Sequence, residues 1–445
     1  MQVLRWLKRK QVQLSMTPYI TLLAFAAPVI IYTWILSYSH LTNLREIFAA
    51  LHTMSLRQVE GHNRCRHWNA THYKCLPNTF LIGASKCGTT SLVEYLSELP
   101  GVELVSRRIY PKDRHREIHR FDRRSYASNW NFWEIADEWA SAPIVSDVDT
   151  VVVHYTPHYL YAPTVPMDLK NWNDKIMKQA DSDQQQQQLQ QSPSSASSDQ
   201  MKFIVMLRDP VERALSSYWF GNSHLFGDLQ DHGSTEEFEQ LASAEMKQRD
   251  TYNECMRMEG HGADGLLQDD NVGVTLGEGT HRVENALEKC FGDKLRDPEL
   301  GGRHIDKGVY VDQLQRWFSS FPPAFVGGSA SYYLSSLEAM KDNQSSELSR
   351  LLEFLKVPAS GTESGTATTK AEEKSFGAKK LKREKTLSDY RMLSKPNALT
   401  ARPRLQHLAD LRAFYEPYNA KLRILLYEKL GMSEDSISTR TWSKT

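Results

Sequence analysis

The sequence lacks several features that would assign it to a special class of protein. Its 54 lysines and arginines are balanced by 54 aspartates and glutamates, so a strongly basic nucleic-acid binder is excluded for the chain as a whole. Five cysteines and 23 glycines among 445 residues are too few for a disulfide miniprotein or a collagen-like chain. Apolar residues are not scarce: they make up 40% of the chain, which is enough to bury a core and excludes a mainly disordered protein.

Long apolar runs are also uncommon, but residues 17–38 form one of 22 residues without a charged side chain. About 20 apolar residues span a bilayer as a helix. Four basic residues and no acidic one precede this run, which keeps the N-terminus in the cytosol. We predict a cytoplasmic tail at 1–16, a transmembrane signal anchor at 17–38, and a lumenal or external location for the rest. A cleaved signal peptide is the alternative, although residues 37–40 make a poor cleavage site.

The cysteines suit an oxidising compartment, in which disulfides Cys65–Cys75 and Cys255–Cys290 are plausible and Cys87 remains a free thiol. Asn69 and Asn343 begin sequons and are the predicted glycosylation sites of a lumenal chain. The two histidines between Cys65 and Cys75 lack the usual metal-ligand spacing, so we predict no metal site.

The rest of the chain is predicted to form one domain that two inserts interrupt. We predict a lumenal stem at 39–75, a domain at 76–432 and a tail at 433–445. The Gln/Ser tract at 179–200 and the segment at 359–386 have little to bury, and both are predicted to be disordered inserts.

Strand and helix patterns alternate within the predicted domain. Residues 79–82 form a short apolar run, and a helical pattern follows at 88–99. Residues 201–207, MKFIVML, are a second buried strand, after which Asp209 and Pro210 cap and start a helix. Two strand–helix units predict an α/β fold with a central parallel sheet flanked by helices. A last helical pattern at 403–430 is expected to break at Pro417.

The segment between the first strand and its helix, GASKCGTT at 83–90, resembles a phosphate-binding loop. Small residues let the backbone wrap a phosphate, and the helix N-terminus supplies amide groups and a positive dipole. The nucleotide-binding template G-x-x-x-x-G-K-[ST] is matched at both glycines and at Thr90, but Thr89 stands at the lysine position and the lysine is Lys86. This shift counts against nucleoside triphosphate hydrolysis. A P-loop kinase and a tight turn without a ligand remain the alternatives.

A second motif, RDPVERALSSY, begins where the strand at 201–207 ends. Arg208 is expected at the carboxyl end of that strand, where open α/β sheets bind ligands. Ser216 follows about two helical turns later, and a guanidinium with a hydroxyl suits a second phosphate. Arg213 is expected on the helix surface in a salt bridge.

Together these two segments resemble the donor-binding signatures of the sulfotransferase superfamily, which uses 3′-phosphoadenosine 5′-phosphosulfate. With the predicted anchor, the chain is similar to Golgi carbohydrate sulfotransferases of the heparan and chondroitin type. The resemblance implies a P-loop-like sulfotransferase fold and a donor site made from both loops. The implied donor-binding residues are Lys86, Cys87, Gly88, Thr89, Thr90, Ser91, Arg208 and Ser216.

A third segment, REIHRFD at 116–122, is similar to the K-E-x-H-F-F-D segment of glycosaminoglycan sulfotransferases. The resemblance implies that Glu117 is the catalytic base, with His119 and Asp122 supporting it and Lys86 acting on the donor. Arg116 and Arg120 depart from that pattern and are expected, with Asp122, on the acceptor side. A surface glutamate in a charged loop is the alternative. Residues 107–124 carry eight basic side chains against three acidic ones, which suits capture of an anionic polymer.

Three further matches are less specific. His154 and Tyr155 open a segment similar to the acceptor side of these enzymes, although heparan 3-O-type members have a lysine where Tyr155 stands. Residues 308–317 resemble a G-x-Y…L…W segment that places Tyr310 near the donor and Trp317 in the core. Lys395 is expected in a loop that closes over the 3′-phosphate.

These observations predict transfer of a sulfuryl group from 3′-phosphoadenosine 5′-phosphosulfate to a hydroxyl or amine of a carbohydrate. The expected acceptor is an anionic or neutral polysaccharide of glycosaminoglycan type, and the expected location is the Golgi lumen. No metal and no nucleic-acid partner are predicted. A non-catalytic, membrane-tethered polysaccharide-binding protein is the alternative from another functional class.

Overall fold

The computed structural model describes residues 58–59, 62–105, 117, 119–122, 142–187, 200–225, 234–259, 289–290, 303–324, 330–357, 405–433 and 442. The predicted anchor, Arg116, Lys395, the insert at 359–386 and most of the basic segment lie outside these residues. Within the described part of the chain, no helix combines the length and the hydrophobicity that crossing a membrane requires.

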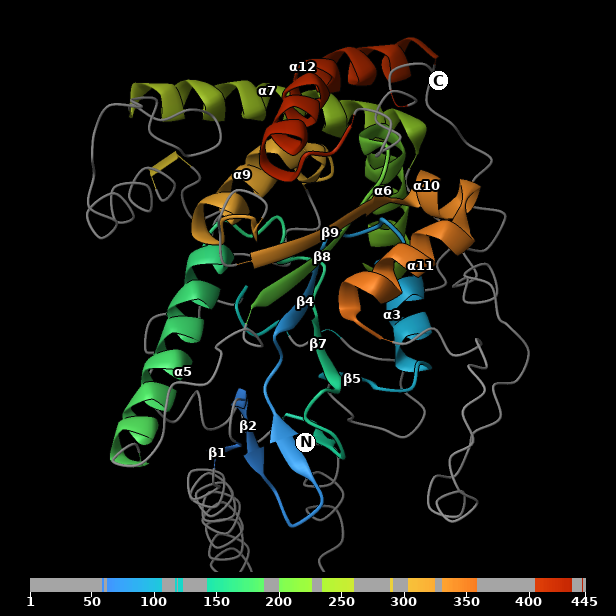
Figure 1. Ribbon diagram of the computed structural model, residues 1–445. Helices are drawn as coiled ribbons and strands as arrows, with labels where there is room; N and C mark the ends of the chain where they lie inside the picture. Colours follow the sequence, from blue (N-terminus) through green and yellow to red (C-terminus); the bar gives the residue numbers. More distant parts are fainter. Residues whose placement is uncertain are drawn as a thin grey trace, which may run out of the picture. The chain divides into compact units, whose positions relative to one another are not determined.

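Five parallel strands form the central sheet, in the order β5-β7-β4-β8-β9 (Figure 1). The predicted strand at 201–207 is confirmed as β8, and the run at 79–82 lies in β4. Both strands are interior to the sheet, and all their residues but Lys202 are buried. Burial on both faces explains why these strands are apolar throughout instead of alternating. The strands are β4 Thr79–Gly83, β5 Val102–Val105, β7 Val151–Tyr155, β8 Met201–Leu207 and β9 Ala330–Ser336.

Helices cover both faces of this sheet, as the α/β prediction requires. In Figure 1, α5 and α9 lie on one side of the sheet, and α3, α10 and α11 on the other. The first group and its neighbours are α5 Val165–Gln187, α6 Pro210–Leu225, α7 Thr235–Met258, η2 Asp306–Gly308, α9 Tyr310–Ser320 and α12 Leu405–Leu430. The others are α3 Thr89–Ser97, α10 Leu337–Asp342 and α11 Gln344–Leu355.

Aromatic side chains fill the core between the sheet and the helices. Trp317 of α9 is fully buried, as predicted, with its ring 5.1 Å from that of Phe203 in β8. On α5, Trp172 packs edge-on against Phe80 of β4. The core therefore fixes the two central strands from which the candidate site projects.

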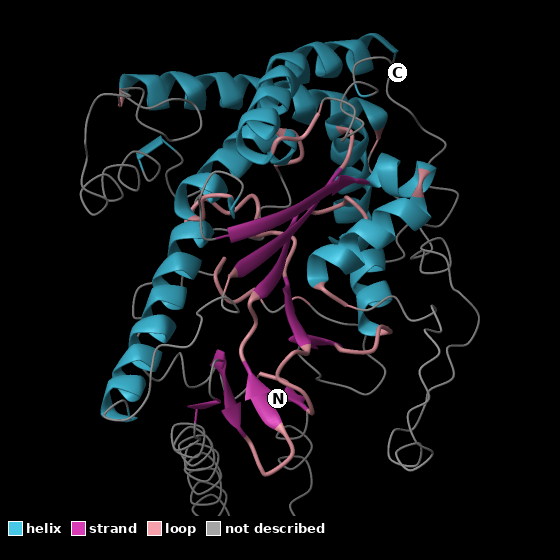
Figure 2. Ribbon diagram, viewed as in Figure 1, coloured by secondary structure: helices cyan, strands magenta, loops and turns pink. Residues whose placement is uncertain are grey.

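A separate antiparallel sheet, in the order β1-β2-β3-β6, is formed by three strands that precede β4 and one that lies between β5 and β7 in the sequence (Figure 2). Its strands are β1 Gln58–Val59, β2 His62–His67, β3 Tyr73–Cys75 and β6 Ile144–Val145. Cys65 and Cys75 face each other across β2 and β3, and the predicted disulfide joins them. Arg64 donates hydrogen bonds to the Pro77 carbonyl and to Asn173 of α5. The described part of the predicted stem is thus folded and fastened to the domain.

The other predicted disulfide, Cys255–Cys290, is also present and joins the end of α7 to the pair at 289–290. Both sequon asparagines, Asn69 and Asn343, are exposed.

Two helices run further than the sequence indicated. Helix α5 continues to Gln187, into the predicted insert, because glutamine is a good helix former and buried Trp172 and Ile176 anchor the preceding turns. Helix α12 passes through Pro417 without ending, so the predicted break is wrong. Buried residues on both sides of Pro417, Tyr415 before it and Leu422 after it, hold the helix in place.

Candidate active site

The candidate site lies where β4 and β8 end beside each other. The chain leaves β4 toward β5 and β7 on one side of the sheet, and β8 and β9 extend the other side. Ligands of open α/β sheets bind at such a switch point, beyond the carboxyl ends of the strands. Here the two predicted loops meet: the Arg208 guanidinium donates to the backbone carbonyl of Lys86, with an Nη1–O distance of 3.3 Å.

The loop after β4 is shaped by its backbone. A Cβ on Gly83 would lie 2.6 Å from the Leu160 Cβ, so only glycine permits this close approach. Lys86 and Gly88 have φ values of 70° and 83°, in the left-handed region. Gly88 is the N-cap of α3 and no side chain caps that end, so the amides and the positive end of the helix dipole face the loop.

The Lys86 side chain points toward α6. Its ammonium lies 3.4 Å from the centroid of the Phe220 ring. Burial, with the nearby Arg208 charge, lowers the pKa of Lys86 to about 8. The side chain is therefore mostly charged at neutral pH and close to its titration point.

The loop after β8 starts α6 in the predicted way. The Asp209 carboxylate accepts hydrogen bonds from the Val211 and Glu212 amides at 2.8 and 3.1 Å, and Pro210 occupies the first turn. Arg208 also lies 3.6 Å from the Glu212 carboxylate, and Ser216 follows on the same helix, partly buried. A guanidinium and a hydroxyl are thus both available along α6.

Cys87 and Tyr310 lie beneath both loops. The Tyr310 hydroxyl donates to the Arg208 carbonyl at 3.0 Å and lies 3.6 Å from the Cys87 sulfur. Both side chains are almost completely buried, so they support the loops from below, and their contact with the donor stays a prediction. Burial raises the pKa of the Cys87 thiol to about 11.

On the other side of the α3 N-terminus, the described residues around Glu117 form a line of contacts. The Glu117 carboxylate lies 3.1 Å from Nε2 of His119, and Nδ1 of His119 lies 2.8 Å from Oδ2 of Asp122. Burial disfavours a charged His119, but its hydrogen bonds to Asp122 and Glu117 prevail and raise its pKa to about 9. Asp122 is buried, yet hydrogen bonds from His119 and His158 hold its pKa well below its usual range.

Hydrogen bonds join the segment at 119–122 to the turn that follows β7. The Tyr159 hydroxyl accepts hydrogen bonds from the Arg120 and Phe121 amides, at 2.9 and 3.2 Å. The Tyr155 hydroxyl lies 3.2 Å from that of Thr90, so β7 also contacts the helix that carries the first loop. Burial raises the pKa of Tyr155 well above its usual range, which keeps the phenol neutral.

Two residues differ from their predicted roles. His154 was expected to face the acceptor, but it is fully buried between the rings of Phe80, Phe121 and Tyr159, and burial lowers its pKa to about 3. Arg213 was expected on the surface, but it is fully buried and donates to the His304 carbonyl.

Comparisons with known proteins show the family to which the chain belongs. The family model described as "Sulfotransferase domain" matches residues 76–396. The chain belongs to the sulfotransferase family. It is 24% identical over 313 residues to the membrane-associated sulfotransferase kil1 of Dictyostelium discoideum, an alignment that covers 64% of this chain and 56% of the relative. The chain thus spans little more than half of that relative's length. A crystal structure of a sulfotransferase from Alicyclobacillus acidocaldarius matches with a TM-score of 0.42 and 16% identity, covering 80% of this chain and 97% of that one.

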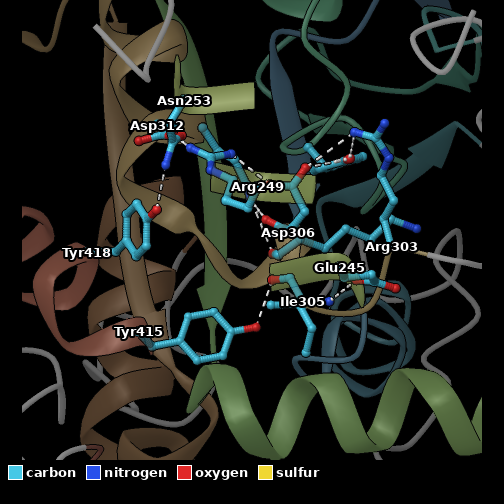
Figure 3. A network of polar contacts seen from close by, with 12 residues as sticks. Glu245, Arg249, Asn253, Arg303, Ile305, Asp306, Asp312, Tyr415 and Tyr418 are labelled. Carbon is cyan, nitrogen blue, oxygen red and sulfur yellow. Dashed lines mark hydrogen bonds and ion pairs between the residues drawn. The ribbon is translucent and has the colours of Figure 1, made fainter. Parts of the chain in front are cut away.

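Sequence reasoning missed a buried polar network in this sulfotransferase, next to Tyr310. Figure 3 shows Arg249 of α7 between two carboxylates: it lies 2.7 Å from Asp306 and also pairs with Asp312 of α9. Glu245 accepts hydrogen bonds from the amides of His304 and Ile305, and the Tyr415 hydroxyl of α12 donates to the Ile305 carbonyl. Three helices therefore fix the segment that leads to Tyr310.

Among the residues that the structure describes, no group of three or more His, Cys, Asp or Glu side chains is arranged to hold a metal ion.

Proposed function

We propose that this sulfotransferase moves a sulfuryl group from 3′-phosphoadenosine 5′-phosphosulfate to a hydroxyl or amine of a carbohydrate. The observation that carries this proposal is the contact between the Lys86 loop and Arg208 at the carboxyl ends of β4 and β8. One donor with a phosphate at each end would engage both loops at once.

The donor's two ends need different partners, and the chain offers both. At the 5′ end, Lys86, Thr89, Thr90, Ser91 and the amides at Gly88 would hold the phosphosulfate through charge, hydroxyls and the helix dipole. At the 3′ end, Arg208 and Ser216 would hold the second phosphate, with Lys395 closing over it. The start of α3 suits an anion, since its N-cap Gly88 makes no side-chain cap hydrogen bond to the first amides.

Glu117 would accept the proton of the attacking hydroxyl, because a positioned carboxylate can serve as a general base. The oxygen would then attack sulfur in line with the departing 5′-phosphate. Lys86 and the loop amides would stabilise the charge that develops on that leaving group. His119, protonated at neutral pH, would orient the Glu117 carboxylate, which lies 3.1 Å from its Nε2.

The acceptor is proposed to be a polysaccharide of glycosaminoglycan type, contacted by Arg116 and Arg120, whereas Asp122 and Tyr155 are buried and would support the site from within. The proposed location is the Golgi membrane, with a single type II anchor at 17–38 and the domain in the lumen. Two disulfides and two exposed sequon asparagines in the described residues support an oxidising, glycosylating compartment.

Transfer of radiolabelled sulfate tests the proposal. The purified full chain is incubated with labelled donor and a panel of chemically desulfated heparin and chondroitin, and the product is identified by disaccharide analysis. We expect Glu117→Gln to lower kcat by roughly 10²- to 10⁴-fold. Lys86→Ala should lower it by roughly 10²- to 10³-fold.

Glu94→Gln on α3 and Lys341→Ala on α10 are matched controls and should keep full activity. Full activity of the Glu117 variant would remove that residue from the mechanism. In a thermal-shift assay, 3′-phosphoadenosine 5′-phosphate should stabilise the chain more than ATP with magnesium does, and the opposite preference would favour a kinase.

A further inference from the structure

We propose that His158 is a positioning residue for the base: it orients Asp122, which orients His119, which in turn aims Glu117. The inference deepens the proposed function, on which it rests for the role of Glu117. His158 follows β7 in the sequence. In the series of contacts His158–Asp122–His119–Glu117, it lies at the opposite end from Glu117, the proposed base.

The geometry is continuous over four side chains. Nδ1 of His158 lies 3.2 Å from Oδ2 of Asp122, the same oxygen that lies 2.8 Å from Nδ1 of His119. The other ring nitrogen of His119 lies 3.1 Å from the Glu117 carboxylate. The Asp122 side chain is completely buried, whereas those of His119 and Glu117 are about one-third exposed or less, so the line runs from the interior to an accessible carboxylate.

The protonation states give each contact a direction. Burial lowers the pKa of His158, so its ring is neutral and carries one N–H, which it can donate to the ionised Asp122. His119 is protonated at neutral pH and can donate from both nitrogens, one to Asp122 and one to Glu117. Oδ2 of Asp122 therefore lies close to Nδ1 of both histidines, at 2.8 Å from His119 and 3.2 Å from His158, and these two contacts orient the carboxylate.

His158 is itself rigidly placed, which a positioning role requires. It follows Pro157 in the turn after β7, and its carbonyl accepts the amides of Tyr161 and Ala162 at 3.2 Å each. The titratable groups that face its ring are Asp122, His119, Lys307 and Tyr161, the last with its ring centroid 5.8 Å away. Among the described residues, Asp122 and Glu117 are hydrogen-bonded to His119, and the rings of His158 and His154 interact with it electrostatically.

The test compares His158→Ala with His158→Asn, since the asparagine amide can place an N–H where Nδ1 of histidine stands. In each variant of the full chain, the pKa of His119 is measured by NMR of ¹³C-labelled histidine, with His119→Gln to assign the signal. Loss of the Asp122 contact in the alanine variant should lower the His119 pKa by about one unit, and asparagine should restore most of it. This readout needs neither donor nor acceptor.

Activity supplies the second readout, using the labelled donor and desulfated heparin or chondroitin. We expect His158→Ala to lower kcat roughly 10- to 100-fold with an unchanged KM for the donor, and to move the alkaline limb of the pH profile downward. His158→Asn should recover most of both effects. His67→Ala, at an exposed histidine of β2, is the matched control and should match the parent.

An unchanged His119 pKa in the alanine variant, with a normal melting temperature, would overturn the proposal, as would equal behaviour of the alanine and asparagine variants. If the His119 pKa shifts as expected but no variant or parent transfers sulfate, the contact line stands and the proposed function fails.

Discussion

The conformation of Lys86 is constrained at three places: its backbone dihedral angles, its carbonyl oxygen and its side-chain ammonium. Its backbone adopts a left-handed conformation, its carbonyl accepts from Arg208, and its ammonium lies against the face of Phe220. An aromatic face attracts a cation, which offsets part of the cost of its burial. The lowered pKa shows that this compensation is incomplete, so the charge of Lys86 is sensitive to small changes in pH.

We therefore expect binding of 3′-phosphoadenosine 5′-phosphate to weaken above pH 8. The ammonium is present below its pKa of about 8 and is lost above it, so the dissociation constant should rise roughly five- to tenfold between pH 7 and 9. Isothermal titration calorimetry at several pH values measures this. Lys86→Arg should remove the weakening because arginine stays charged, and Lys86→Met should bind weakly at every pH; the parent's slope persisting in the methionine variant would contradict the assignment to Lys86.

At the scale of single residues, the sequence alone located best those site residues whose position is set by the backbone of a neighbouring strand. Lys86 and Arg208 could be placed because each follows a buried strand directly. The side chains of His154 and Arg213 could not, because their burial depends on partners distant in the sequence, such as His304, which lies 91 residues after Arg213. His158 lies four residues after His154, in the segment that the sequence places near the acceptor, but nothing in its sequence neighbourhood points to Asp122.

Among the elements, the turn from β4 into α3 depends most on a single residue type. Gly83 has a φ of 155°, and an added Cβ would lie 2.7 Å from the Pro157 carbonyl oxygen as well as against Leu160. Gly101, between α3 and β5, also has a positive φ, but an added Cβ there meets nothing within 4 Å. Substituting alanine at Gly101 would therefore test the cost of the positive φ alone, whereas alanine at Gly83 would add the cost of steric crowding.

Gly101→Ala is expected to lower the free energy of unfolding by about 1 kcal/mol, from backbone strain alone. Gly83→Ala should lower it by about 3 kcal/mol or more, since the segment after β7 must move away from the new methyl group. Urea unfolding measures both. Equal losses for the two variants would mean that the close approach at Gly83 is relieved without cost.

Element boundaries followed from sequence where local chemistry sets them. The apolar run at 201–207 and the Asp209-Pro210 start needed no distant partner, and both were placed correctly. Continuation of α12 through Pro417 could not be inferred locally, because packing on α9 and α6 outweighs the lost hydrogen bond. The antiparallel sheet was missed for a similar reason: β6 comes from a segment about 70 residues after β3.

For the whole molecule, the network around Arg249 joins α7, α9 and the segment before Tyr310. Removing its guanidinium would leave the carboxylates of Asp306 and Asp312 buried with less positive charge. A carboxylate left without its buried partner is strongly destabilising.

Arg249→Gln should accordingly cost about 3–5 kcal/mol of stability. Arg257→Gln is the matched control on the same helix: Arg257 pairs with Glu254, but both side chains are more than half exposed, so the loss of stability should be much smaller than for Arg249→Gln. Differential denaturant unfolding of the two variants checks this, and similar losses in both would show that burial adds nothing to the Arg249 pairs.

The burial of Cys87 has a consequence for the two disulfides. A fifth, unpaired cysteine could attack either bond during folding, because thiol–disulfide exchange proceeds through the thiolate. Once the loop closes over it, the sulfur is shielded from solvent and its deprotonation is disfavoured. Closure of the loop after β4 therefore also protects the disulfide pairing from scrambling in the mature chain.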